Sequence, residues 1–155
     1  QATGLVIKSH SGGDVPDFDQ IEVLQDMGVS PSAFIWTHAQ NGSLEKNLEA
    51  AKRGAWVSLD GVNISDAEEP EGNKSFYLDR LKAFKKAGQL NRVLLSHDAG
   101  WYDVGQTDGG DFRRYTDIHE FLVPALNENG FSEEEINTLL NDNPATAFKI
   151  QVRQE

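Results

Sequence analysis

The feature that most limits the fold is an alternation of short apolar runs with helical patterns along the whole chain. The apolar runs cover residues 5–10, 34–38, 56–60 and 93–97. Each run has the length of a buried strand and is bounded by turn residues. Strands that alternate with helices build parallel α/β sheets. The sequence therefore predicts an α/β fold of four consecutive βα units, either a doubly wound sheet or part of a (β/α)8 barrel.

Helical patterns fill the segments between these runs. We expect helices over 18–28, 44–53, 75–87, 118–129 and 133–141, followed by a short helical turn from Asn143 to Phe148. Ser43 is a suitable N-cap, and Ser132 with Glu135 has the spacing of a capping box. Asp117 is expected to cap the helix that follows it. These caps fix where most of the helices begin.

In two segments, the apolar residues follow neither the spacing of a helix nor that of a strand. Residues 63–73 are polar and are predicted to form a loop. Residues 99–116 contain four glycines and follow the fourth apolar run, where active-site loops occur in α/β proteins. We expect Trp101, Tyr102 and Arg113 to form a substrate-binding part of this second loop. The alternative is that the loop packs on itself.

The composition narrows the range of partners. The chain has 155 residues and a formal charge of −11, which disfavours nucleic acid and anionic membranes because both require a basic face. It contains no cysteine, which excludes disulfides and cysteine-based zinc sites. The lack of cysteine favours a reducing compartment such as the cytoplasm. Because the chain begins with Gln1, we expect that sequence upstream of it is missing.

Metal-capable side chains follow three of the apolar runs. His10, His38 and Asp98 each stand at the end of a predicted strand. Because chemistry gathers at the carboxyl ends of parallel strands, we expect the three side chains to face one site. Imidazole and carboxylate groups are common metal ligands. A single histidine at a strand end is usually structural, but the repeated placement favours a metal site.

Four further polar residues are open to more than one interpretation. Asp60 ends the third run and either binds a metal, orients a metal ligand or caps the following loop. Side chains alternate along a strand, so only one of His97 and Asp98 faces the site. Lys8, inside the first run, either pairs with a carboxylate or neutralises a substrate anion. His119 is expected to lie on a helix surface.

Five segments resemble, in order, the second half of the phosphotriesterase-like proteins of the amidohydrolase superfamily. They are TGLVIKSHSGG, GVSPSAFIWTHAQN, AAKRGAWVSLDGV, NRVLLSHDAGW and GFSEEEINTLLNDNPATAF. The resemblance covers about residues 3–150. It implies strands five to eight of a TIM (β/α)8 barrel. Residues 1–155 would then be the C-terminal half of a single hydrolase domain, with the N-terminal half outside this chain.

The resemblance also implies a role for each strand-end residue. His10 and His38 match metal-binding histidines, and Asp98 matches a metal-binding aspartate that takes a proton from the attacking hydroxide. Asp60 and His97 are implied to lie behind these ligands. The implied cofactor is a pair of divalent metal ions, most often Zn²⁺. The His-x-His pair and the bridging lysine that the family's first half supplies have no counterpart in this sequence.

The activity that the resemblance implies is metal-dependent hydrolysis of a lactone, a carboxyl ester or a phosphoester. Gly61 and Asn41 stand where the organophosphate-degrading members carry a histidine and an aspartate, so the proton relay of those members is missing here. The expected partners are a small ester or lactone substrate and the N-terminal half-barrel or a second copy. The alternatives are an inactive half-barrel that needs a partner chain, and a complete doubly wound module that binds one cation.

Overall fold

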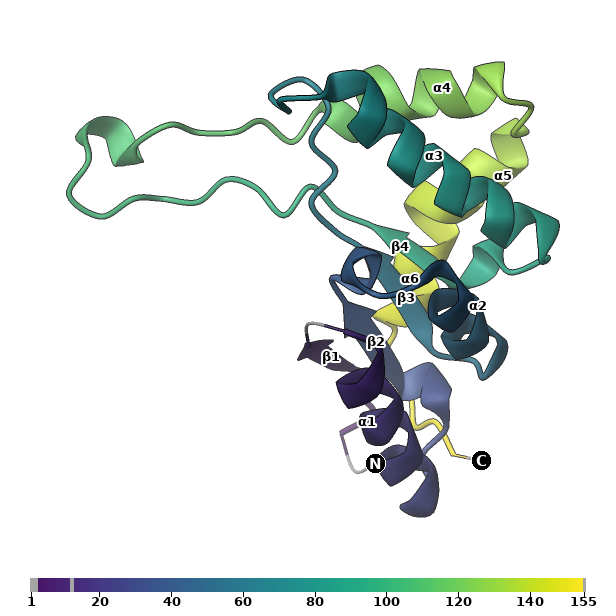
Figure 1. Cartoon of the computed structure of the whole chain (residues 1–155). Coiled ribbons are helices and arrows are strands. Elements are labelled where there is room, and N and C mark those ends of the chain that lie inside the picture. The colour runs from purple at the N-terminus through teal and green to yellow at the C-terminus, as the bar shows by residue number, and fades with distance from the viewer. Residues whose placement is uncertain (1–2, 12, 155) are drawn as a thin grey trace.

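The computed structural model, which describes residues 3–11 and 13–154, contains one parallel sheet (Figure 1). Its strands are β1 (Ile7–His10), β2 (Phe34–Thr37), β3 (Trp56–Leu59) and β4 (Val93–Leu95). Neighbouring strands pair in the order β1-β2-β3-β4, and each pair is parallel. The predicted α/β fold of consecutive βα units is confirmed. The sheet is open, with β1 and β4 at its two edges.

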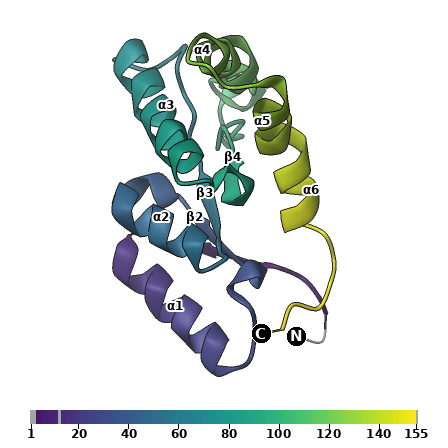
Figure 2. The same ribbon diagram turned by 90° about the vertical axis from the view of Figure 1, so that its right-hand side faces the viewer.

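Helices cover the sheet unequally on its two faces. The helices are α1 (Asp14–Asp26), α2 (Leu44–Lys52), α3 (Pro70–Lys86), α4 (Val123–Glu128), α5 (Glu133–Asn137) and α6 (Asn143–Ala147). In Figure 2, α1, α2 and α3 lie along one side of the sheet and α6 lies on the other. Within the described residues, no helix is both long and apolar enough to cross a bilayer.

The alternation of side chains along the strands produces two apolar clusters. Phe34 and Trp36 of β2 are fully buried in the larger cluster, which lies under the helices. Ile35, between them, belongs to a smaller cluster with Trp56, Leu94 and Ala147 of α6. Successive residues of a strand point to opposite faces. On its second face, the sheet therefore packs against α6 through this smaller cluster.

Two predicted caps are confirmed and two helices begin earlier than expected. Ser43 accepts a hydrogen bond from the N–H of Lys46, and Ser132 and Glu135 form the predicted capping box. The first helix begins at Asp14 rather than at residue 18. The third begins at Pro70, so the last part of the predicted loop 63–73 is helical. Proline suits a first helical position because its fixed φ fits the helix and its missing N–H has no partner there.

The prediction that Asp117 caps a continuous helix over 118–129 is wrong. Residues Ile118–Leu122 form a π-helical turn, and α4 begins only after it. The carboxylate of Asp117 instead accepts hydrogen bonds from the backbone N–H groups of Ile64 and Ser65, at 2.5 and 2.9 Å. Pro124 has no N–H to continue an α-helical ladder across this point, which favours the wider turn before it.

Residues 99–116, here called the arm, leave the body of the molecule as two extended limbs (Figure 1). A short 3-10 turn at Thr107–Gly109 lies between the limbs. The N–H of Asp103 donates to the carbonyl of Gly109 at 2.8 Å, which ties the limbs together near this turn. Trp101 and Tyr102 are 68% and 72% exposed. The arm therefore begins shortly after β4, and its Trp101 and Tyr102 side chains extend into solvent.

Candidate active site at the carboxyl ends of the strands

The predicted ligands gather around one cavity. The cavity has a volume of about 300 Å³ and is lined by Lys8, His10, Thr37, His38, Asp60, Ser96 and Asp98. The rings of His10 and His38 meet edge to face, with their centroids 4.6 Å apart. The Nδ1 atom of His38 lies 4.0 Å from Oδ2 of Asp98. Three separate strand ends thus bring the two imidazoles and the carboxylate together.

The backbone at His38 is held by a buried carboxylate. His38 adopts the left-handed conformation, with φ 57° and ψ 37°. Its N–H donates to Oδ2 of Asp60 at 2.8 Å, and its Nδ1 lies 3.6 Å from the same oxygen. The side chain of Asp60 is only 2% exposed. One carboxylate therefore fixes the backbone of His38 and lies beside its ring.

Asp60 is itself held on several sides. Its Oδ1 accepts a hydrogen bond from the hydroxyl of Ser58 at 2.8 Å. Its N–H donates to Oε1 of Gln40, and its carbonyl accepts from the hydroxyl of Tyr77 at 2.7 Å. Burial, and secondarily the charge of Asp60, raises the pKa of Tyr77 to about 12. Tyr77 therefore remains a protonated donor at neutral pH. Asp60 thus holds the backbone of His38 and also lines the cavity itself.

The backbone at Asp98 is also left-handed, with φ 45°, but it is held differently. The N–H of Asp98 donates to Oγ of Ser96 at 3.1 Å. Its carbonyl accepts a hydrogen bond from Nη2 of Arg113 at 2.8 Å. The carboxylate of Asp98 is 37% exposed and faces the cavity. Both contacts that hold this residue act on its backbone and leave the carboxylate available.

His97 lies outside the lining of the cavity. Its Nε2 accepts a hydrogen bond from the N–H of Ile118 at 3.0 Å, and its ring packs edge to face with Tyr115 at 6.3 Å. Burial lowers the pKa of His97, which keeps the ring neutral and able to accept this bond. His97 thus secures the backbone on both sides of the arm. His119 is exposed, as predicted.

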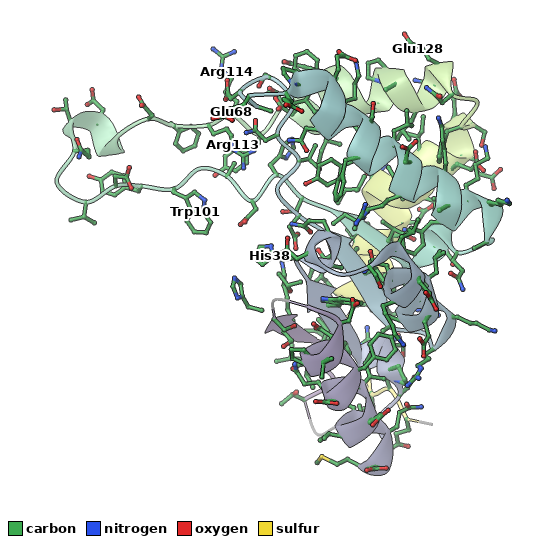
Figure 3. The ribbon with its side chains drawn as sticks, viewed as in Figure 1. His38, Glu68, Trp101, Arg113, Arg114 and Glu128 are labelled. Atoms are coloured by element: carbon green, nitrogen blue, oxygen red, sulfur yellow. The ribbon has the colours of Figure 1, made fainter. Side chains whose placement is uncertain are left out.

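The three predicted arm residues lie in different parts of the arm. In Figure 3, Trp101 lies on one limb and Arg113 lies near the base of the arm. The guanidinium of Arg113 donates to the carbonyls of Val62, His97 and Asp98. Its donors are thus directed at backbone oxygens. Contact of Trp101, Tyr102 and Arg113 with a substrate stays a prediction.

Lys8 lines the cavity without forming an ion pair to any of the described residues. The structure therefore does not support its pairing with a carboxylate. Thr37, opposite His10 in the strand register, also lines the cavity, and its buried hydroxyl has no hydrogen-bond partner among the residues that the structure describes. These two side chains add hydrogen-bond donors to a cavity otherwise dominated by imidazole and carboxylate groups.

The donors suit a metal ion in kind but not in number. Imidazole nitrogens with a carboxylate oxygen are the mixture that Zn²⁺ accepts, and such sites need at least three protein ligands. Within the part of the chain that the structure describes, no group of three or more histidine, aspartate or glutamate side chains is arranged to hold a metal ion. The chain by itself therefore offers an incomplete coordination shell.

The sequence analysis missed the supporting groups Ser58 and Ser96. Each serine stands two residues before a site carboxylate, Ser58 before Asp60 and Ser96 before Asp98. In a strand this spacing puts both side chains on one face. The spacing was therefore a usable signal. Arg113 and Tyr77 gave no such signal, because their contacts are made by residues distant in the chain.

The sequence matches a known protein family over most of its length. Residues 1–148 match the model of the phosphotriesterase family. The chain belongs to this family. The match runs through all four strands and the residues that line the cavity. The four parallel βα units accordingly correspond to part of a (β/α)8 barrel, as predicted.

Individual relatives match the phosphotriesterase-family chain over about half of their length. The phosphotriesterase homology protein of Escherichia coli (strain K12) is 28% identical over 153 residues, which are 95% of this chain and 49% of that protein. N-acetyltaurine hydrolase of Dictyostelium discoideum is 28% identical over 161 residues, covering 97% of this chain and 42% of that protein. These relatives support a family of hydrolases.

A solved structure supports the same correspondence. The crystal structure of the Escherichia coli phosphotriesterase homology protein, complexed with phosphate in its active site, superposes with a TM-score of 0.72 at 26% identity. The match covers 92% of this chain and 47% of that one. The present chain thus spans about half the length of the relatives that it matches.

Proposed function

We propose that this chain supplies half of the active site of a metal-dependent hydrolase that cleaves a lactone, a carboxyl ester or a phosphoester. The observation that carries the proposal is the meeting of His10, His38 and Asp98 at one cavity, from three strand ends. Membership of the phosphotriesterase family supports hydrolysis as the reaction. The residues that line the cavity do not distinguish among these three bonds. The test therefore includes substrates of all three classes.

The chemistry proposed for the site depends on metal. Enzymes of the phosphotriesterase family are generally metal-dependent. A pair of divalent ions such as Zn²⁺ would lower the pKa of a bound water toward neutrality and polarise the bond under attack. In this chain, His10 and His38 would serve as ligands through their imidazole nitrogens.

Asp98 and Asp60 have separate tasks in the proposed mechanism. The carboxylate of Asp98, which is 37% exposed, would orient the attacking water and accept its proton. Asp60 is buried and accepts the N–H of His38, so it orients a ligand. Lys8 adds a positive charge at the same cavity, where it could meet a negative group of the substrate.

The remaining ligands are proposed to come from an N-terminal half-barrel. β1 is an edge strand, and Leu5 and Ile7 are 60% and 44% exposed. Both residues line a cavity of about 500 Å³ beside α1, together with Leu24 and Val29. An unpaired parallel edge strand flanked by exposed apolar side chains calls for a covering element. The half-length match to the relatives favours the missing half of the same barrel over a second copy.

The test is substitution of His10, His38 and Asp98 by alanine in the protein that carries this chain. Hydrolysis of a panel of lactones, aryl carboxyl esters and phosphoesters is measured together with zinc content. Each variant is expected to lose at least ~100-fold in kcat/KM, and His10→Ala and His38→Ala are also expected to lose zinc. His119→Ala, at an exposed helical position, is the control. Unchanged activity and zinc in all three variants would exclude the proposed site.

The competing function is an interaction module without activity. The exposed apolar edge at β1 supports this alternative, because it needs a partner whether or not the cavity is catalytic. The two proposals differ in what the complete protein does. An assembled protein that binds no zinc and hydrolyses none of the panel would favour the interaction module.

A further inference from the structure

Arg113 connects the arm to the backbone on which the site is built. Its Nη1 donates to the carbonyl of Val62, after β3, at 3.2 Å. Its Nη2 donates to the carbonyl of Asp98 at 2.8 Å and also to that of His97. One guanidinium thus bridges the segments that follow two neighbouring strands. The planar fork of arginine is suited to such a bridge, since its donors are held in fixed directions.

The residue that Arg113 holds is conformationally unusual. Asp98 has φ 45°, in the left-handed region that side chains other than glycine disfavour. Such a conformation persists where the surroundings fix it. At Asp98 the described contacts that fix the backbone are Ser96 on the N–H and Arg113 on the carbonyl. Arg113 bears a charge, so its hydrogen bonds are stronger than those between neutral groups.

The direction of the Asp98 carboxylate depends on this backbone conformation. With the left-handed turn in place, Oδ2 of Asp98 lies 4.0 Å from Nδ1 of His38. Rotation of the backbone back to an extended conformation would move the Cβ atom and swing the carboxylate away from His38. The hydrogen bonds that the guanidinium donates to the described residues all go to backbone carbonyls, so its influence on the carboxylate passes through the main chain.

We propose that Arg113 is a positioning residue, which holds Asp98 in its left-handed turn and so directs the carboxylate at the cavity. The proposal rests on the proposed function for its effect on catalysis. It adds a role for the arm. Because Arg113 belongs to the arm, any displacement of the base of the arm is transmitted to Asp98.

The experiment compares Arg113→Ala, Arg113→Lys and the control Arg114→Ala. Arg114 is the next residue of the arm and is exposed, pointing outward in Figure 3. The first readout is amide hydrogen exchange at residues 97 and 98, which requires no activity. We expect Arg113→Ala to raise the exchange rate of the Asp98 amide by about tenfold or more. Arg113→Lys should give an intermediate rate, because one ammonium cannot span the same carbonyls.

The second readout separates positioning from a purely structural role. Arg113→Ala should lower kcat by about tenfold or more with KM nearly unchanged, as for a group that acts on the transition state. Millimolar guanidinium ion should restore part of kcat in Arg113→Ala and leave Arg114→Ala unaffected. A free guanidinium can occupy the carbonyl site but cannot tether the arm, so rescue would identify positioning.

The outcomes are distinguishable from failure of the proposed function. If the wild-type protein hydrolyses none of the panel, the exchange rate of Asp98 still decides the role of Arg113. If Arg113→Ala does not fold, the exchange rate and kcat of Arg113→Lys replace it. Exchange and kcat equal to those of Arg114→Ala, without guanidinium rescue, would overturn the proposal.

Discussion

The site has two left-handed turns, at His38 and at Asp98, and they are secured in opposite ways. The turn at His38 is fixed by Asp60, a carboxylate from the neighbouring strand that is 2% exposed. The turn at Asp98 is fixed by Ser96 and by Arg113 of the arm. Among the described residues, the third such turn outside glycine is at Asp108 near the tip of the arm. The first support belongs to the core and the second to a surface loop.

The difference predicts that changes at the His38 turn mainly affect stability, whereas changes at the Asp98 turn mainly affect the direction of the carboxylate. A buried and fully paired carboxylate cannot be altered without leaving buried donors unpaired, so the His38 turn is tied to folding. The support of Asp98 lies in a loop, where changes are tolerated by the fold. Changes in the arm are therefore expected to alter the direction of the Asp98 carboxylate, and with it the rate, at little cost in stability.

The largest effect is expected from Asp60→Ala. The change leaves the N–H of His38 and the hydroxyl of Ser58 without their acceptor, and each buried unpaired donor costs about 1–3 kcal/mol. The free energy of unfolding, measured with urea, should fall by several kcal/mol, and kcat/KM by at least ~100-fold. Asp66→Ala, at an exposed position of the loop that follows, is the control. Equal stability of the two variants would contradict a structural role for Asp60.

A matched pair of serine variants sharpens the comparison. Ser58→Ala removes a hydrogen bond to the buried Asp60, and Ser96→Ala removes the acceptor for the N–H of Asp98. We expect Ser58→Ala to lower the free energy of unfolding by about 1–2 kcal/mol and Ser96→Ala by less than about 1 kcal/mol. The order should reverse if the Asp98 turn is the more firmly anchored one. Urea unfolding of both variants decides between these results.

The smallest effect on the free energy of unfolding is expected from protonation of His97 at acidic pH. Burial lowers the pKa of this ring below its usual value of 6.5, so the native state prefers the neutral form. Its contribution to stability is complete above the unfolded pKa and is lost as the pH falls through the lower native pKa. The contribution of His97 to the free energy of unfolding should therefore decrease from pH 7.5 to pH 5. His97→Gln, which retains an acceptor for Ile118, should reduce this decrease.

The matching control for acidification is His119→Gln. His119 is exposed, so its replacement should leave the pH dependence of unfolding close to that of the wild type. A pH dependence that is identical in the His97→Gln and wild-type proteins would show that His97 does not anchor the arm. Amide exchange at Ile118, which donates to His97, reports the same event locally.

Local sequence patterns were sufficient to predict which strand-end residues line the cavity. The strand ends at His10, His38 and Asp98 follow from apolar runs, and Asp60 follows from its place after the third run. Their convergence is a consequence of parallel pairing, which brings equivalent strand ends to one edge. The early start of α3 at Pro70 was open to prediction from proline chemistry, although the polar composition of that segment indicated a loop.

The contacts that support these residues, in contrast, join segments that are distant in the chain. Arg113 reaches Val62 across 51 positions and Asp98 across 15, and no periodicity marks these pairs. Asp117 similarly binds the backbone of Ile64 and Ser65 rather than the helix that follows it. A side chain in a loop is available to any carbonyl or N–H that the fold brings near. Such choices follow from tertiary packing, which local sequence does not encode.

The most direct test of the account is a Zn²⁺ titration of the protein that carries this chain, followed by NMR of the four histidine rings of the chain. The account predicts that the ring signals of His10 and His38 shift together at neutral pH. Asp98→Asn should weaken this response, and the signals of His97 and His119 should remain in place. Equal responses from all four rings, or none from His10 and His38, would contradict the claim that these strand ends form one metal site.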